Sequence, residues 1–218
     1  MQFLYHQKAG EEILKLKGEE FSHLKARRVK ENEILTLRNL EDEFVYVYKI
    51  SNLERHSCEL HFLNKENKTT HKKSTLNLAL AVIDIKILEK TLPFLNELGV
   101  ETLHLVFTDF SQRNFKIDLS RFEKIIVSSC EQCGRESKMK IQIYNHIKDF
   151  YERFPEAVLV DFEGEVKEFD LNKIYFVGPE GGFSQSEKQI FKEKIGLKAP
   201  NILKSQTAII SIASKILL

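Results

Sequence analysis

The residues best suited to chemistry lie in one short stretch of the chain, Ile174–Glu187. Its loop contains an acid, Glu180, and three glycines: Gly178, Gly181 and Gly182. Glycines allow backbone conformations with positive φ and let a ligand approach the main chain, because no Cβ is in the way. Ser184 and Glu187 have the spacing of a capping box, which predicts a helix start. A buried strand, a glycine loop and a helix N-terminus commonly hold a small ligand.

The same loop has a simpler interpretation as a turn that only reverses the chain, because short glycine motifs are weak evidence. Its spacing also matches neither of the familiar nucleotide loops. No Gly-x-Gly-x-x-Gly motif follows the first strand, and no Gly-Lys-Ser/Thr sequence ends a P-loop. A nucleotide-binding or redox α/β protein is therefore the weakest of the functions we consider.

The overall composition excludes several classes of protein. The chain has 218 residues, of which 33 are basic and 32 acidic, and its net charge of +1 argues against a general polyanion binder. No stretch approaches the eighteen apolar residues of a membrane span, and the first residues lack the core of a signal peptide. We expect a cytoplasmic protein of one or two domains, without a membrane partner.

The three cysteines, Cys58, Cys130 and Cys133, predict neither a disulfide framework nor a metal site. Cys130 and Cys133 have C-x-x-C spacing, but a second pair of metal ligands is not evident. The pair also falls at the end of a predicted helix, whereas a redox pair of the thioredoxin type lies at the start of one. We interpret the two thiols as side chains on a helix face.

A second candidate for chemistry is a group of cations near the N-terminus: Lys25, Arg27, Arg28 and Lys30. Lysine and arginine bind nucleic-acid phosphates without reading sequence, so the group could contact RNA. It could equally be a solvated helix face, balanced by the nearby acids Glu19, Glu20, Glu31 and Glu33. Charge alone favours the solvated face.

The elements before residue 64 indicate a small, mainly β unit. Four short stretches have the partial alternation of strands, at 12–17, 34–38, 44–50 and 58–63, and a short helix is expected over 19–29. Several short strands of this kind suggest a small barrel. The polar stretch 64–74 is the one plausible domain boundary.

The remaining sequence predicts an α/β domain with a mainly parallel sheet. Strands are expected at 76–83, 103–108, 157–160 and 174–177. One helix should end at Gly99 and has Pro93 within it, and another should begin at Ser120, where Glu123 completes a capping box. The last helix, 207–218, is apolar on more than one side, so it must be buried in the core or against another subunit.

Several separated motifs, taken together, resemble the RsmE family of uracil-N3 ribosomal RNA methyltransferases. They are the stretches 97–100, 111–113, 131–135, 178–184 and 201–208, and the resemblance covers essentially the whole chain. It implies a PUA-like β-barrel that binds RNA over residues 1–68. It also implies a SPOUT methyltransferase domain with a trefoil knot over 69–218. Members of this family act as homodimers on 16S ribosomal RNA, so we expect the assembled 30S subunit as the substrate.

The resemblance also implies S-adenosylmethionine as the cofactor and no metal. Three loops should bind it, with the residues Val160, Asp161, Phe162, Val177, Gly178, Pro179, Glu180, Gly181, Gly182, Leu197, Lys198, Ala199, Asn201, Ile202, Leu203 and Ser205. The residues expected to bind substrate are Lys25, Arg27, Arg28, Arg113, Arg135 and Lys204. Those expected near the reacting atoms are Glu180, Arg135, Lys204 and Gln206.

The chemistry asks for the removal of the proton on uracil N3, since that nitrogen must become nucleophilic. Glu180 could accept the proton, or could only order its own loop. Arg135, Arg113 and Lys204 could stabilise an anion or bind a phosphate, although Arg135 could merely pair with a neighbouring glutamate.

The third motif departs from the family pattern Leu-Gly-x-x-Ile-Leu-Arg-Thr-Glu-Thr-Ala. Lys198 and Ala199 replace the Leu-Gly of the pattern, and Lys204, Ser205 and Gln206 replace its Arg, Thr and Glu. Lys204 keeps the charge without the bidentate fork, and Gln206 loses a carboxylate. Near the N-terminus, the position of a family arginine is held by Val29, with Arg28 one residue away. The alternative function is therefore a catalytically weakened, SPOUT-like RNA-binding protein.

Overall fold

The computed structural model describes residues 2–67, 74–112 and 116–218. It contains two compact units, one made of Met1–Lys72 with Cys130–Ser137 and the other of Lys73–Ser129 with Lys138–Leu218. The expected domain boundary between residues 68 and 69 falls outside the described residues, so it stays a prediction.

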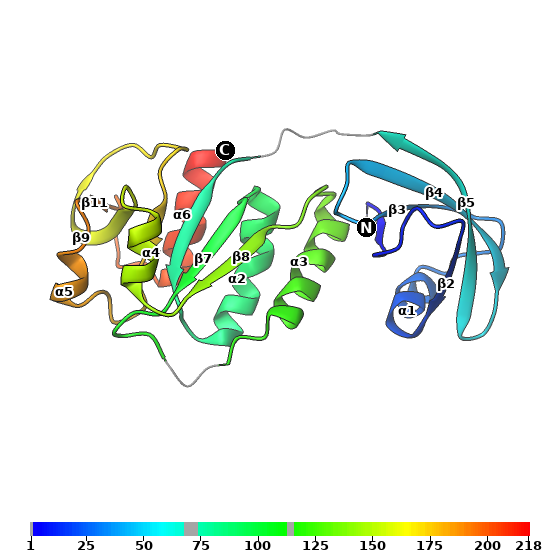
Figure 1. The fold of residues 1–218 in the computed structure, drawn as a ribbon, viewed down its shortest axis with the longest axis horizontal. Coiled ribbons are helices and arrows are strands. Elements are labelled where there is room, and N and C mark those ends of the chain that lie inside the picture. The colour runs from blue at the N-terminus through cyan, green and yellow to red at the C-terminus, as the bar shows by residue number, and fades with distance from the viewer. Residues whose placement is uncertain (1, 68–73, 113–115) are drawn as a thin grey trace. The chain divides into compact units, whose positions relative to one another are not determined.

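The first unit is a curled sheet of five strands with one helix (Figure 1). The elements are β1 (Leu4–Tyr5), β2 (Ile13–Lys17), α1 (Gly18–Ala26), β3 (Ile34–Arg38), β4 (Phe44–Leu53) and β5 (Ser57–Asn67), and the strand order is β1-β3-β4-β5-β2. The four predicted strands and the helix are confirmed, whereas β1 was not predicted. The polar residues 64–67 were expected in a linker, but they pair with the start of β4. Closure of the sheet into a barrel stays a prediction.

The segment Cys130–Ser137 joins the first unit although it is far away in the sequence. The carboxylate of Glu131 accepts a hydrogen bond from the backbone N–H of Tyr5 at 2.7 Å, and its carbonyl accepts one from Gln2 N at 2.7 Å. Arg38 and Glu136 form a buried ion pair at 3.0 Å. The segment is therefore bonded to β1 and β3, over distances in the chain that local sequence patterns do not reveal.

The second unit is an α/β domain built on a sheet of six parallel strands, as predicted. The strands are β6 (Asn77–Ala81), β7 (Thr102–Val106), β8 (Lys140–Tyr144), β9 (Val158–Val166), β10 (Tyr175–Val177) and β11 (Glu193–Gly196), in the order β11-β9-β10-β6-β7-β8. The helices are α2 (Ile85–Leu98), α3 (Leu119–Cys133, whose last residues from Cys130 belong to the first unit), α4 (Ile147–Arg153), α5 (Gln185–Lys188) and α6 (Ser205–Leu217). Strands β8 and β11 and helix α4 were not predicted.

Two helix boundaries show which local signals were reliable. Gly99 ends α2 in the left-handed conformation with φ +100°, as predicted, and Pro93 lies inside that helix. The predicted cap at Ser120 is wrong, because α3 already begins at Leu119. The side chain of Asp118 instead accepts a hydrogen bond from Arg121 N at 3.1 Å. Asp118 therefore takes the capping role that the sequence assigned to Ser120.

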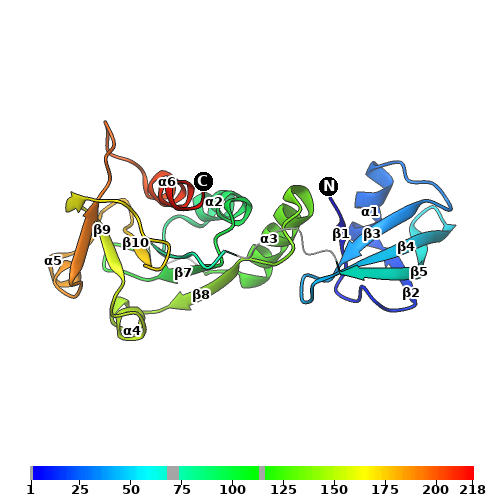
Figure 2. The same ribbon diagram turned by 90° about the horizontal axis from the view of Figure 1, so that it is seen from above.

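The helices cover both faces of the parallel sheet, with α2 and α6 on one face and α4 on the other (Figure 2). Helix α6 buries Ala208, Ile209, Ile212 and Ala213 against the core. Ile210, Ile216 and Leu217 are half-buried and Leu218 is exposed, so apolar surface remains on the outer side of the helix. None of the helices in the described part of the chain is long and apolar enough to cross a membrane.

Candidate functional site

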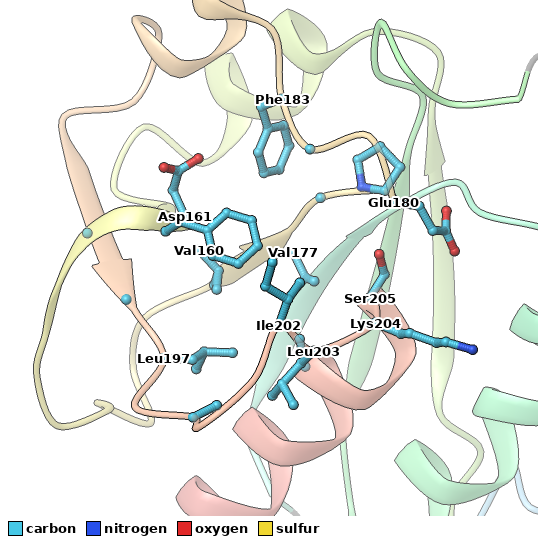
Figure 3. Close-up of a pocket in the computed structure, with 18 of the residues that line it drawn as sticks. Val160, Asp161, Val177, Glu180, Phe183, Leu197, Ile202, Leu203, Lys204 and Ser205 are labelled. Carbon is cyan, nitrogen blue, oxygen red and sulfur yellow. The ribbon is translucent and has the colours of Figure 1, made fainter.

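A cavity of about 1020 Å³ lies where a strand and two loops of the second unit meet (Figure 3). The first segment was expected as a loop at residues 160–162, but that is wrong, because these residues lie within β9. The second segment is the loop after β10, and the third is the loop that connects β11 to α6. The carboxyl ends of parallel strands are a common place for ligand sites, because the loops there converge at one edge of the sheet. Every residue predicted to bind the cofactor lines this cavity, with the single exception of Lys198.

The residues predicted near the reacting atoms are only partly brought together. Glu180 and Lys204 line the cavity. Gln206 is half-buried in the first turn of α6 and is not a lining residue. Arg135 belongs to the segment that clusters with the first unit. Arg113 lies outside the described residues.

The glycine loop owes its shape to two different properties of glycine. A Cβ on Gly178 would lie 2.8 Å from the ring of Phe183, which is buried and packs edge-on against Phe176 at 5.0 Å. Gly182 has φ +71°, a conformation that other residues rarely adopt. Its N–H donates to the carbonyl of Pro179 at 2.9 Å and closes the turn. The expectation of positive φ is therefore confirmed for Gly182 but is wrong for Gly178 and Gly181.

A second pair of glycines lines the cavity and was not predicted. A Cβ on Gly164 would lie 2.3 Å from the backbone of Ile195, and one on Gly196 would lie 2.4 Å from the carbonyl oxygen of Gly164. The pair lets β9 and β11 approach closely beside a register shift at Lys194. In the sequence, only the two glycines themselves could have indicated this close approach, and they do so only if β11 is already recognised as a strand.

The predicted capping box at the start of α5 is confirmed, and its glutamate has a second role. One carboxylate oxygen of Glu187 accepts from Ser184 N at 2.9 Å, and the other accepts from Asp109 N at 2.8 Å. The hydroxyl of Ser184 donates to the Asp109 carboxylate at 2.6 Å. Glu187 is buried, so these bonds fix the loop after β7 against the glycine loop.

A buried ion pair that was not predicted joins β9 to α5 at the cavity. The ammonium of Lys188, at the end of α5, lies 2.9 Å from the carboxylate of Asp161, and both residues line the cavity. Burial alone would raise the pKa of Asp161, but the N–H of Glu163 and the ammonium of Lys188 outweigh that effect and lower it. The hydrogen bond to Asp161 in turn raises the pKa of Lys188. Both groups are therefore charged near neutral pH.

The opposite rim of the cavity carries exposed charges. Glu180 and Lys204 extend to the same side, away from the apolar side chains of Val160 and Leu197 (Figure 3). Lys204 occupies the N-cap position of α6 and forms no side-chain cap bond there. The side-chain oxygen of Gln206 is buried, and it has no hydrogen-bond partner among the described residues. The rim thus presents a carboxylate and an ammonium to solvent beside the cavity.

The other sequence candidates lie outside the cavity. Lys25, Arg27 and Arg28 are exposed at the end of α1, and Arg28 has φ +55°. The three cysteines, all within the described ranges, form no disulfide, and burial raises the pKa of the Cys58 thiol to about 11, which makes it unreactive. In the part of the chain that the structure describes, no group of three or more His, Cys, Asp or Glu residues is placed to hold a metal ion.

Comparisons of the sequence with known proteins match both parts of the chain. Residues 70–217 match a family described as an RNA methyltransferase domain, and residues 16–63 match an RNA methyltransferase PUA domain. A ribosomal RNA small subunit methyltransferase E from Helicobacter pylori is 42% identical over 222 residues, which are 98% of each chain. A protein of the same name from Aquifex aeolicus is 30% identical over 230 residues, again 98% of each chain.

Solved structures show the same fold. A ribosomal RNA small subunit methyltransferase E from Neisseria gonorrhoeae, bound to S-adenosyl methionine, superposes with a TM-score of 0.79 at 23% identity. The match covers 98% of this chain and 95% of that one. A methyltransferase from Legionella pneumophila, also in complex with this cofactor, gives a TM-score of 0.81 at 22% identity, over 98% and 96% of the two chains.

Proposed function

The chain belongs to the ribosomal RNA small subunit methyltransferase E family, and from that premise we propose its reaction in detail. It is an S-adenosylmethionine-dependent ribosomal RNA methyltransferase. Its target is N3 of a uridine in 16S ribosomal RNA, presented by the assembled 30S subunit in the cytoplasm. The observation that carries this proposal is the meeting of the three predicted cofactor-binding segments around one cavity.

The cavity fits the cofactor in size and chemistry. Its volume of about 1020 Å³ is just above the usual range for small-molecule sites, roughly 300–1,000 Å³. Val160, Leu197, Ile202 and Leu203 offer apolar contacts for a purine base. Phe183 leaves no room for a side chain at Gly178, and Gly178, Gly181 and Gly182, which have no side chains, line the cavity. These residues would hold the cofactor, with the backbone of the glycine loop.

When bound, the cofactor supplies a methyl group that is already electrophilic, so the protein chiefly has to align the target base and manage one proton. The proton on N3 must leave before the nitrogen can bond to carbon. We assign its acceptance to the Glu180 carboxylate or to solvent beside it. The ammonium of Lys204 would stabilise the negative charge that then spreads over the uracil oxygens. The exposure of both groups on one rim supports this division.

The other predicted residues have roles away from this proton. We propose that Gln206 orders the start of α6 and that Arg113 and Arg135 bind substrate. Lys25, Arg27 and Arg28 would contact RNA phosphates from the first unit, which has the PUA match. Such contacts position an RNA without reading its sequence.

We also propose the family's homodimer and trefoil knot for this chain. The half-buried side chains of Ile210, Ile216 and Leu217 on the outer side of α6 support an interface between copies. The packing of α6 on α2, β6 and β10, after the cavity loop, is compatible with the knot. Sedimentation of the pure protein as a monomer at micromolar concentration would contradict the dimer.

The test of the proposed function is methyl transfer to purified 30S subunits that lack the modification. We expect radioactive methyl groups from the cofactor to appear as 3-methyluridine after digestion of the 16S RNA. Calorimetric titration with S-adenosylmethionine should show binding in the absence of RNA. RNA binding without any cofactor binding would instead favour the catalytically weakened relative.

A further inference from the structure

Phe110 is an exposed aromatic residue beside the glycine loop that none of the roles above uses. Its side chain is 53% exposed, and it follows β7 in the turn at 108–111. A Cβ built on Gly181 would lie 3.2 Å from Phe110 Cβ and 3.4 Å from Cγ, so the side chain lies directly over that glycine. Gly181 therefore leaves the space that Phe110 occupies.

The turn that carries Phe110 is held rigidly. The hydroxyl of Ser111 accepts from Thr108 N at 3.1 Å and bonds the Thr108 hydroxyl at 3.0 Å, and both residues are buried. Asp109 between them is fixed at its N–H by Glu187 and at its carboxylate by Ser184. Single exposed apolar residues are common on protein surfaces and by themselves indicate nothing. Here, however, the backbone on both sides of the ring is fixed while the ring faces solvent.

The position of the ring relates it to the chemistry of the rim. Gly181, under Phe110, follows Glu180 directly in the chain, and Glu180 and Lys204 extend to the same side of the cavity (Figure 3). An exposed aromatic ring therefore lies over the residue next to Glu180. A nucleobase outside its helix needs such partners, because its faces stack on aromatic rings while its edge forms hydrogen bonds.

We propose that Phe110 is the stacking platform for the target base. One face of the base packs on the ring, and the edge with N3 meets the charged groups of the rim. This inference rests on the proposed function and adds a substrate-binding residue to it. Phe110 lies outside the motifs that indicated the family, so no pattern in the sequence assigns it a role.

The test compares Phe110→Ala with Phe94→Ala. Phe94 is 52% exposed on α2 and serves as the matched control. Stacking on one base predicts that Phe110→Ala loses about 5- to 150-fold in kcat/KM for 30S subunits. Its calorimetric affinity for S-adenosylmethionine should stay within about twofold of wild type. Phe110→Tyr should restore most of the activity, and Phe94→Ala should behave as wild type.

A direct measurement of the contact comes from Phe110→Trp, because the chain has no tryptophan of its own. The new indole is a single fluorophore at the proposed site. Titration with a short uridine-containing oligonucleotide, at saturating cofactor, should quench it as the base stacks. The variant Phe94→Trp should show no change over the same titration.

The outcomes separate this inference from the proposed function. If Phe110→Ala transfers methyl groups as fast as the wild type, the inference is wrong, while the proposed function still holds. An equal loss of cofactor affinity would assign Phe110 to the cofactor cavity and also overturn it. A change in sedimentation together with the loss of activity would assign the ring to an interface between copies, which would likewise overturn the inference. Absence of methyl transfer by wild type would instead refute the proposed function.

Discussion

Asp161 and Lys188 form an ion pair at 2.9 Å that joins strand β9 to α5, the helix after the glycine loop. Their side chains are only 5% and 14% exposed. Removing Lys188 leaves the buried Asp161 carboxylate with only the Glu163 N–H and the charge of Lys194, and this loss costs more than the pair itself contributes. The pair therefore sets the spacing between two walls of the cavity.

We expect Lys188→Met to lower the free energy of unfolding by about 2–4 kcal/mol and to weaken cofactor binding. Lys188→Arg should retain most of both, because it restores a cation near Asp161. Lys192→Met is the control, since the Lys192–Glu156 pair is exposed and should change stability by less than about 1 kcal/mol. Urea unfolding and calorimetric titration measure the two effects, and equal results for Lys188→Met and Lys192→Met would refute the role.

The glycine loop predicts different effects for a methyl group added at Gly178 and at Gly182. A Cβ on Gly178 would meet the ring of Phe183 at 2.8 Å, and that ring is buried against Phe176. We expect Gly178→Ala to cost about 1–3 kcal/mol of stability and at least about tenfold in cofactor affinity, because the ring must move. At Gly182 a Cβ meets open space, so Gly182→Ala should show only the strain of φ +71°, about 1 kcal/mol. Similar affinity losses in both variants would contradict this assignment.

The features that the sequence predicted well are the local ones. The strand before Gly178, the capping box of Ser184 and Glu187 and the left-handed end at Gly99 depend on residues within a few positions of one another. The pair of Asp161 and Lys188 spans 27 positions, and the bond from Tyr5 to Glu131 spans 126. Such contacts depend on the completed sheet, so no periodicity reveals them.

For the cavity too, the features marked by local sequence were predicted, and those that depend on distant contacts were missed. Its three segments were located through the resemblance, because glycines and the third motif mark them in the sequence. The contributions of Gly164 and Gly196 were missed because β11 has only four residues and was not predicted. That of Lys188 was missed because its partner Asp161 is 27 positions away. The cap at Ser120 failed for another reason. Asp118, two positions earlier, starts the helix sooner, because its side chain accepts from Arg121 N and its carbonyl accepts from Phe122 N.

His104 predicts how stability depends on pH. It is buried among Tyr144, Phe150 and Phe154, and burial, with the nearby charge of Arg153, lowers its pKa to about 4. The unfolded chain takes up this proton near pH 6.5, while the folded protein does not until about pH 4. The contribution of His104 to stability is therefore present above about pH 6.5 and is lost as the pH falls toward about 4.

The expected loss between about pH 7 and about pH 4.5 is about 2–3 kcal/mol from this residue. His104→Phe should remove it, because a phenyl ring fills the space without a proton to bind. Urea unfolding of both proteins at the two pH values isolates the effect, since the carboxylates titrate equally in each. If the wild type loses no more stability between the two pH values than His104→Phe does, burial does not prevent the protonation of His104 in the folded protein.

The basic group of the first unit predicts a salt effect. If Lys25, Arg27 and Arg28 contact phosphates, replacing all three with Ala should weaken RNA binding for every sequence tested. The slope of log K against log salt should fall by about two. Cofactor affinity should not change. Lys90, Lys124 and Lys148, which are exposed on the second unit, give a triple-Ala control with the same change in charge. Equal slopes in the two triple variants would favour the solvated face.

The last prediction concerns the two departures nearest the chemistry, Lys204 and Gln206. If the charge of Lys204 stabilises the uracil anion, Lys204→Ala should lose about one to two powers of ten in rate, or roughly 1.5–3 kcal/mol. Lys204→Arg should stay close to wild type. Were a carboxylate at 206 the required base, the natural chain would be nearly inactive and Gln206→Glu would restore it. We expect an active wild type, because Glu180 is exposed on the same rim as Lys204. Methyl transfer to 30S subunits distinguishes these two mechanisms. An inactive wild type whose activity is restored by Gln206→Glu would overturn the mechanism that we propose.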